Sequence, residues 1–423
     1  MRTPRRFIGM EDFPAVSETT IGAAMSTLPA FPFTADHPLH LSPLLGEARA
    51  GRVPIRVQLG HGDPAWLVTS YDDARFVLSS PAFGRDPERA GIPAGRVAGV
   101  TPMDPASQTL LTVDPPDHTR LRRFVYRTFT PRRVEQLRAG TQRIADRLID
   151  AMIEAGPPAD LVQGFGLDLP IEVICDLLGV PATDRARFVA WLDALLSTSG
   201  LTMEEMQTSI TEMNAYLADL AARRVHEPTG DLTGALVRER IEGDRLTDDE
   251  VNNLLRALLS AGHETTASQI PNFVFLLLRS GDYARLVADP GLVPTAVEEL
   301  LRYVPLITQG SMTRFVLEEV EVGGVLLRRG EQVLVELAAA NRDTETFPDG
   351  ETLDIGRRNN PHIAFGHGLH RCVGAALARM ELQVALSTLT TRLPGLRLTD
   401  PPDQVPWDTE RFVRRAKKLL VTW

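Results

Sequence analysis

The chain has 423 residues, of which 43% are hydrophobic and 24% are charged, as in an ordinary globular protein with a large core. It carries 45 Lys and Arg against 55 Asp and Glu, which gives a formal net charge of −10. A surface that binds nucleic acid needs an excess of basic residues to contact the phosphates. The charge balance therefore argues against a nucleic-acid-binding protein.

The cysteines and the apolar runs narrow the class of protein further. Only two cysteines are present, so no disulfide framework is expected, and a reducing cytoplasm fits this composition. Cys175 lies in the apolar run 171–175 and is expected to pack in the core. No run reaches the ~20 apolar residues that span a bilayer, and the basic N-terminus lacks the apolar segment of a secretory signal. We therefore expect a cytoplasmic protein without membrane contact.

Helical periodicity dominates the chain. Residues 1–27 are expected to be a flexible leader, because polar termini are commonly mobile. Over residues 28–423 no repeat, low-complexity tract or Gly/Ser linker interrupts the pattern. Strand patterns are fewer and comprise 65–69, a hairpin at 320–327 turned by two glycines, and 333–335. These patterns predict one mainly α domain with a small β portion.

Two helix starts are well marked in the sequence. At the first, Asp114 can cap a helix and Pro115 suits the first helical position. At the second, residues 247–250 form a capping-box pattern, which predicts a long apolar helix over about 251–279.

The most specific pattern is the segment from Phe365 to Gly374, which reads Phe-x-x-Gly-x-x-x-Cys-x-Gly with Cys372 as its cysteine. A thiolate ligand needs its negative charge stabilised, and backbone N–H groups in a glycine-containing loop can donate to the sulfur. A helix predicted to begin near Val373 would direct the positive end of its dipole at the same atom. Thiolate ligation of heme iron favours cleavage of the O–O bond.

The residues of this loop allow other interpretations. His367, His370 and Cys372 could be zinc ligands, although no fourth ligand follows at a finger-like spacing. Cys372 could also be a catalytic nucleophile or an inert thiol of the core.

The loop resembles the heme-binding signature of cytochromes P-450, and the resemblance extends over nearly the whole chain from about Leu28. It implies the cytochrome P-450 fold, in which a single α-rich domain with a small β portion surrounds a buried heme b. It also implies that Cys372 is the axial ligand of the iron.

The segment 261–266 of the long predicted helix supports the resemblance. Gly262 weakens a helix by about 1 kcal/mol relative to Ala, and Thr265 can bond its own backbone. Together they predict a weak point where dioxygen and water could lie. In the family, the acid and alcohol that match Glu264 and Thr265 deliver protons during oxygen activation.

Two further segments match the family's supporting elements. Glu299 and Arg302 have the spacing of a helical ion pair, and the resemblance implies that they form a buried pair completed by Arg357. His118 and Arg122, four residues apart, would share a helix face. The matches that the resemblance implies for the heme propionates are His118, Arg122, Arg314 and His370.

The implied reaction inserts one atom of dioxygen into a hydrophobic small molecule, by hydroxylation or epoxidation, in natural-product biosynthesis. The substrate could be free or carrier-bound, and the family's cavity-lining segments correspond to 89–109, 190–213, 306–312 and the vicinity of Phe412. Some family members instead couple rings or form new rings. A heme-thiolate sensor without turnover would keep Cys372 but would not need Glu264 and Thr265.

Electrons are expected to come from a ferredoxin and its ferredoxin reductase, as in the family's soluble bacterial members. Arg120, Arg123 and Arg127 recur on one face of the helix that follows Asp114. Such a stripe could steer an acidic ferredoxin, or it could be an ordinary solvated helix face.

Overall fold

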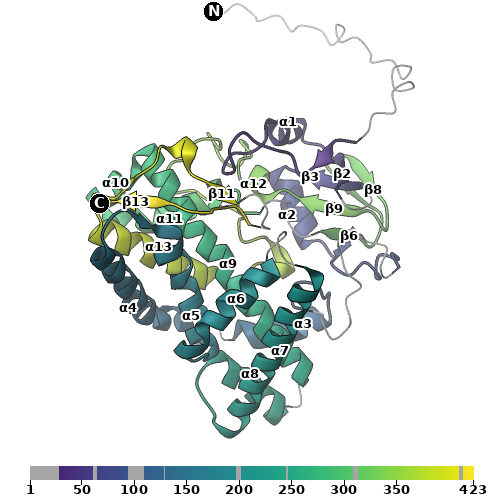
Figure 1. Ribbon diagram of the computed structural model, residues 1–423. Coiled ribbons are helices and arrows are strands. Elements are labelled where there is room, and N and C mark those ends of the chain that lie inside the picture. The colour runs from purple at the N-terminus through teal and green to yellow at the C-terminus, as the bar shows by residue number, and fades with distance from the viewer. Residues whose placement is uncertain are drawn as a thin grey trace, which may run out of the picture.

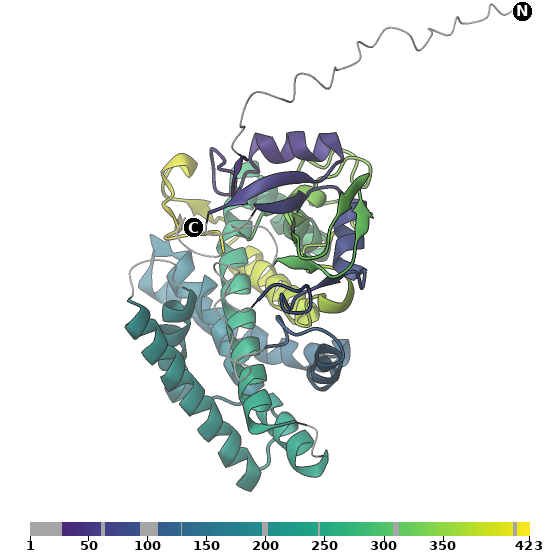
Figure 2. The same cartoon turned by 90° about the vertical axis from the view of Figure 1, so that its right-hand side faces the viewer.

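The long helix α9 (Asp248–Ser280) passes through the middle of the computed structural model, which describes residues 28–423 except 61–63, 94–108, 128, 197–201, 244–245, 308–312 and 409–412. Its 33 residues span about 50 Å at 1.5 Å per residue. Figure 2 shows this helix running the height of the molecule, with other helices packed on its sides. The capping box of Thr247 and Glu250 is present, as predicted.

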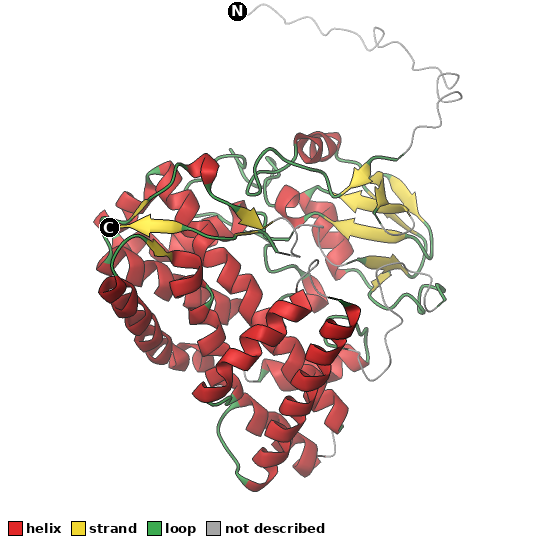
Figure 3. Cartoon of the chain, in the orientation of Figure 1, coloured by secondary structure: helices red, strands yellow, loops and turns green. Residues whose placement is uncertain are grey.

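The other helices gather around α9 and form most of the molecule (Figures 1 and 3). The remaining α-helices of the described residues are α1 (Pro43–Gly51), α2 (Tyr71–Ser79), α3 (Asp117–Tyr126), α4 (Pro131–Ala155), α5 (Asp168–Leu178), α6 (Arg185–Leu196), α7 (Met203–His226), α8 (Leu232–Gly243), α10 (Asp282–Ala288), α11 (Val293–Tyr303), α12 (Leu337–Ala340) and α13 (Ala375–Arg392). The short helices are η3 (Val162–Gly166), η4 (Ala182–Asp184), η5 (Pro290–Leu292), η6 (Gly368–His370) and η7 (Pro402–Gln404). None of the described helices combines the length and the apolarity that a membrane span requires.

A six-stranded sheet lies beside the helices, with the strand order β1-β2-β3-β9-β6-β4 (Figure 3). Its strands are β1 (Ala30–Phe31), β2 (Ile55–Leu59), β3 (Pro64–Val68), β4 (Phe83–Gly84), β6 (Arg314–Val316) and β9 (Gln332–Val335). The smaller sheets contain β5 (Ala159–Asp160), β7 (Val320–Val322), β8 (Val325–Leu327), β10 (Arg397–Leu398), β11 (Trp407–Asp408), β12 (Arg415–Ala416) and β13 (Leu420–Thr422). The three predicted strand regions are therefore confirmed, within one residue at their ends.

The predicted hairpin is formed by β7 and β8, with Val320 opposite Leu327 and Val322 opposite Val325. Both turn residues have positive φ, 53° at Gly323 and 79° at Gly324, as a two-residue turn with left-handed residues requires. The mainly α fold with a small β portion is therefore the observed one.

The start of α3 differs from the prediction. The helix begins at Asp117, its N-cap is Pro116, and no side chain caps it. The carboxylate of Asp114 instead accepts hydrogen bonds from the backbone N–H of Arg85, at 2.9 and 3.0 Å, and of Asp86, at 3.1 Å. The prediction that Asp114 caps the helix was wrong because tertiary donors that follow β4 compete for the same side chain.

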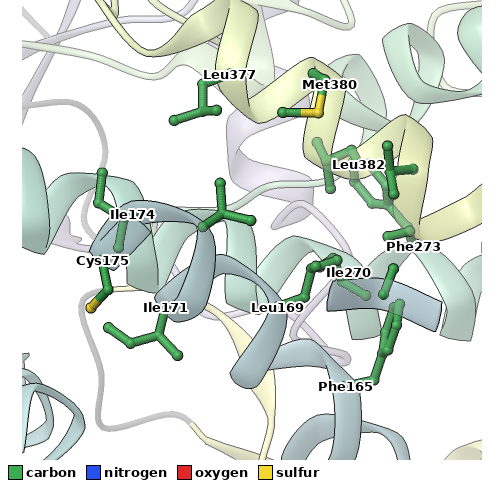
Figure 4. Packing of buried hydrophobic residues seen from close by; sticks show 14 of the residues in the cluster. Phe165, Leu169, Ile171, Ile174, Cys175, Ile270, Phe273, Leu377, Met380 and Leu382 are labelled. Atoms are coloured by element: carbon green, nitrogen blue, oxygen red, sulfur yellow. The ribbon is translucent and has the colours of Figure 1, made fainter. Parts of the chain in front are cut away.

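The main core fills the space between α5, α9 and α13. Figure 4 shows Ile171 and Ile174 of α5, Ile270 and Phe273 of α9, and Leu377 of α13 in this cluster. Cys175 lies in the same layer with none of its surface exposed, and burial raises the pKa of its thiol to about 12. The expectation that Cys175 packs in the core is confirmed.

A buried ion pair on α11 supports the segment that leads to Cys372. Arg302 donates to both carboxylate oxygens of Glu299, at 2.6 and 2.8 Å, and neither side chain is exposed. Arg357 donates to the same carboxylate at 3.1 Å, and so does Asn360. The guanidinium of Arg302 also donates to the carbonyls of Asn341, Gly350 and Thr352.

We predict that Arg302→Met lowers the free energy of unfolding by about 3–5 kcal/mol, because it leaves the carboxylate of Glu299 buried without its main partner. Urea unfolding of the purified protein measures this change. Arg138→Met is the matched control, since Arg138 pairs with Glu135 at the same spacing on the surface. Equal losses in the two variants would show that the Glu299 pair is not structurally important.

Candidate functional site

Cys372 lies in a loop between η6 and the first turn of α13. Its backbone N–H donates to the carbonyl of Phe365 at 2.8 Å, which closes the loop. The backbone N–H of Gly374, the N-cap of α13, donates to the Cys372 sulfur. The structure therefore contains the amide donor and the nearby helix start that the sequence predicted for a thiolate, with α13 beginning at Ala375.

Two glycines give this loop its shape. Gly366 and Gly368 have φ values of 70° and 68°, which other residues adopt only with strain. A Cβ atom on Gly368 would lie 2.4 Å from the carbonyl oxygen of Leu78, at the end of α2. A Cβ atom on Gly366 would meet nothing within 4 Å. The loop is thus pressed against α2 at Gly368 but is free of such contact at Gly366.

The surroundings of the Cys372 sulfur both oppose and favour its ionisation. Burial among protein groups raises the pKa of the thiol, while the N–H of Gly374 and the charges of Arg122, Arg371 and Arg379 lower it. The residue nevertheless has exposed surface. Compensating groups therefore surround the sulfur while Cys372 keeps exposed surface, as the ligand role predicted for it requires.

A cluster of basic side chains lies beside this loop. The rings of His118 and His370 are 4.1 Å apart, and neither nitrogen of His118 has a hydrogen-bond partner among the described residues. Burial, followed by the charges of His370 and Arg122, lowers the pKa of His118 to about 4. Burial also lowers the pKa of Arg314 to about 10, against the opposing charge of Asp114.

Arg85 belongs to the same cluster, although it is not among the residues predicted from the sequence. Burial and the charge of Arg314 hold the pKa of Arg85 well below its usual value, and its Nε atom is buried without a partner in the described residues. Asp114 opposes both shifts. A lone Arg in the segment 83–86 has no spacing that marks it, so its proximity to Arg314 arises only from the pairing of β4 with β6.

The chemistry of this basic cluster indicates what kind of group it can bind. Buried histidine nitrogens without acceptors and arginines of lowered pKa are costly unless an anion compensates them. Heme carries two propionates, and guanidinium and imidazolium groups are the usual partners of such carboxylates. The donor set around Arg85, His118, Arg314 and His370 therefore fits the propionates of a heme, and Cys372 would supply the thiolate ligand.

Arg122 contacts the backbone of the cysteine loop directly. Its guanidinium donates to the carbonyl of Arg371 at 2.6 Å, beside Cys372. His118 and Arg122 both reach the cysteine loop from α3, so the prediction that they face the same way is confirmed. The described contact of Arg122 is nevertheless with the backbone of the loop.

Thr265 and Glu264 are adjacent residues of α9, and their side chains have different partners. The hydroxyl of Thr265 donates to the carbonyl of Ala261 at 2.9 Å, which confirms that it bonds its own backbone. Glu264 is buried, and its carboxylate lies 3.4 Å from the guanidinium of Arg415 in β12. The helix continues through Gly262, where a Cβ atom would lie 3.0 Å from Ile174 of α5. Gly262 therefore permits close helix packing at this point.

Two other expectations from the sequence concern a zinc site and the residues that contact the substrate. Within the described part of the chain, no group of three His, Cys, Asp or Glu side chains could hold a metal ion, which does not support the zinc interpretation of His367, His370 and Cys372. Much of the expected substrate-contact region, including 94–108, 308–312 and Phe412, lies outside the described residues.

An accessible, charge-compensated cysteine at the start of a helix, beside a crowded basic cluster, defines the class of heme-thiolate proteins. A family model described as Cytochrome P-450 matches residues 290–423. The chain is 47% identical over 397 residues to nocardicin C N-oxygenase of Nocardia uniformis subsp. tsuyamanensis, with 93% of this chain and 98% of that protein covered. It is 45% identical over 395 residues to mycinamicin IV hydroxylase/epoxidase of Micromonospora griseorubida, with 93% and 98% covered.

A solved structure supports the same assignment. The crystal structure of HinD with NMFT and NO has a TM-score of 0.87 and 46% identity, and the match covers 94% of this chain and 100% of that one. The chain belongs to the cytochrome P-450 family. It is a monooxygenase with heme b as its cofactor, and the fold predicted from the cysteine loop is confirmed.

We predict that Gly368→Ala destabilises the protein more than Gly366→Ala. A left-handed residue other than Gly costs about 1–2 kcal/mol at either position, and the backbone clash at Gly368 should add about 1–3 kcal/mol. Urea unfolding and the heme content per protein measure the two effects. Equal destabilisation by the two substitutions would contradict the tight contact with α2.

Proposed function

We propose that Cys372 is the axial thiolate of heme b and that residues 28–423 form the heme domain. The observation that carries this proposal is the accessible Cys372 sulfur with an amide donor and three arginines around it. When bound, a thiolate-ligated heme activates dioxygen, inserting one oxygen atom into the substrate and releasing the other as water. We assign the propionate contacts to His118, Arg122, Arg314, His370 and also Arg85.

Glu264 and Thr265 are the proposed proton-delivery pair. Thr265 directs its hydroxyl hydrogen to the carbonyl of Ala261, which leaves the oxygen lone pairs free to accept from a water molecule. Glu264 is a buried carboxyl one residue away, at a position where a proton can be exchanged with such a water. The pair therefore relays protons along α9 to the reaction centre.

The substrate is a hydrophobic small molecule of natural-product type. This proposal rests on the relatives, one named as an N-oxygenase of nocardicin C and the other as a hydroxylase/epoxidase of mycinamicin IV. Both names describe the insertion of oxygen into an elaborated natural product. We accordingly propose hydroxylation, epoxidation or a related oxygen insertion, in the cytoplasm, where both free cysteines fit a reducing environment.

The electron donor is proposed to be an acidic ferredoxin, supplied by a ferredoxin reductase. Arg120, Arg123 and Arg127 were predicted to form an exposed basic stripe on α3. Two of these arginines are paired, because Arg120 bonds Glu250 and Arg127 bonds Glu239 at 2.6 Å. Their charges are largely compensated. Arg123 is exposed on the same helix, so we retain it as the docking residue of the stripe.

Other exposed groups extend the docking surface around the cysteine loop. Arg75 of α2 and Arg371 both lower the pKa of His367, after burial, so both lie near this loop. Phe76, Leu369 and Tyr126 are exposed apolar side chains of α2, η6 and α3. Exposed apolar side chains together with nearby basic groups suit a partner of opposite charge.

We predict that Cys372→His retains some heme but loses the red-shifted Soret band that the reduced carbon monoxide complex of a thiolate-ligated heme shows. Imidazole is a neutral ligand, so it does not push electron density onto the iron as a thiolate does. The absorption spectrum of the reduced protein with carbon monoxide measures this difference. A variant that keeps the red-shifted band would disprove the assignment of Cys372.

We predict that reversing charge at Arg75 and Arg123 slows ferredoxin-supported turnover at least about tenfold at low ionic strength, where electrostatic steering is strongest. Turnover driven by peroxide should stay unchanged, because it needs no electron partner. Arg397→Glu is the control for the change in net charge, because Arg397 is an exposed residue of β10. Loss of both activities would instead indicate a folding defect.

A further inference from the structure

The C-terminal hairpin of β11 and β12 is fixed along α9. Trp407 pairs with Ala416 and Asp408 with Arg415. The Trp407 ring packs edge-on against Phe275 of α9, with centroids 5.2 Å apart. Because both strands belong to one hairpin, this contact sets the position of β12 relative to the helix.

The residue before Arg415 strengthens this anchoring. The carbonyl of Arg414 accepts a hydrogen bond from Asn272 of α9 at 2.7 Å, and its N–H donates to the carbonyl of Leu306 at 2.8 Å. The backbone immediately before Arg415 is therefore held by two hydrogen bonds, so the Arg415 side chain starts from a fixed point on the hairpin. Glu264 lies about two turns of α9 from Asn272. A side chain placed in this way is preorganised for its partner.

That partner is Glu264. The two side chains are only 4% and 8% exposed, and the guanidinium and carboxylate approach to 3.4 and 3.5 Å. Burial of two charges is costly and is compensated here by their mutual attraction. Removal of the guanidinium would leave the carboxylate in a medium that favours its protonated form.

The length of this contact distinguishes it from a structural ion pair. In the same protein, Arg302 holds Glu299 with two bonds of 2.6 and 2.8 Å. A carboxylate that accepts two short hydrogen bonds from one guanidinium is fixed in its orientation. At 3.4 Å, the contact with Arg415 gives Glu264 electrostatic support without the short two-bond geometry of the Arg302–Glu299 pair.

We infer that Arg415 is a positioning residue that keeps Glu264 ionised and directed for proton transfer, so that the C-terminal hairpin controls proton delivery on α9. This inference rests on the proposed role of Glu264. Residues 409–412 lie outside the described part of the chain, whereas Arg415 and its contacts lie within it. Asp408 lies opposite Arg415 in the strand register and is the acid of the hairpin used as a control below.

A double-substitution cycle tests the inference in the holoenzyme. Glu264→Gln should lower the ratio of product formed to reductant consumed by at least about tenfold, since acid–base groups typically contribute about 10²–10⁴-fold. Arg415→Met should lower the same ratio, and adding it to Glu264→Gln should change nothing further. Arg415→Lys, which keeps the charge, should restore much of the ratio.

A second measurement does not depend on turnover. Arg415→Met should show the infrared carbonyl band of a protonated carboxyl group, and the band should vanish when Glu264→Gln is added. Arg224→Met is the matched control, because Arg224 forms a similarly shielded pair with Asp231 at 3.0 Å, between α7 and α8. It should lower stability but leave the ratio of product to reductant unchanged.

The possible failures can be told apart. If Glu264→Gln leaves the ratio unchanged, the proposed role of Glu264 is wrong, and the inference on Arg415 is wrong with it. If Glu264→Gln acts but Arg415→Met has no effect, or adds independently to it, only the inference on Arg415 is overturned. An effect of Arg415→Met that Asp408→Asn reproduces would assign Arg415 to the hairpin instead.

Discussion

A negatively charged sulfur inside a protein must be compensated without being covered, and the proposed thiolate role of Cys372 places this constraint on the residues around it. The N–H of Gly374 and three arginines provide the compensation, while the loop leaves the sulfur accessible. Hydrogen bonds and charges of this kind are effective only when their positions are fixed, because the low dielectric around them magnifies both gains and losses. The loop therefore needs rigid support.

Two neighbouring carboxylates of α11 provide that support. Glu299 holds Arg302, Arg357 and Asn360, and thereby fixes the chain that leads to the loop. Glu298 accepts from Arg379 of α13 at 2.7 and 2.8 Å and contacts His362. Burial opposes its ionisation, but these two partners lower the pKa of Glu298 to about 2. The loop is thus fixed both before and after Cys372.

The sequence was sufficient for features that depend on local order. The pattern around Cys372, the capping box at Thr247 and the paired glycines after Val322 each contain their cause within a few residues. The sequence was insufficient where hydrogen-bond partners lie far apart along the chain. Asp114 was expected to cap a helix, yet donors near Arg85 engage it, because β4 lies against it in the fold. No local pattern encodes such a choice.

The two acid–arginine pairs of this protein differ in the same respect. Glu299 and Arg302 are three residues apart, so the helix alone brings them together, and burial then makes the pair tight and structural. Glu264 and Arg415 are 151 residues apart and meet only because β12 is fixed on α9. A pair of the second kind changes whenever the two elements shift relative to each other, whereas a pair within one helix does not. The proton delivery proposed for Glu264 is therefore tied to the packing of the C-terminal hairpin.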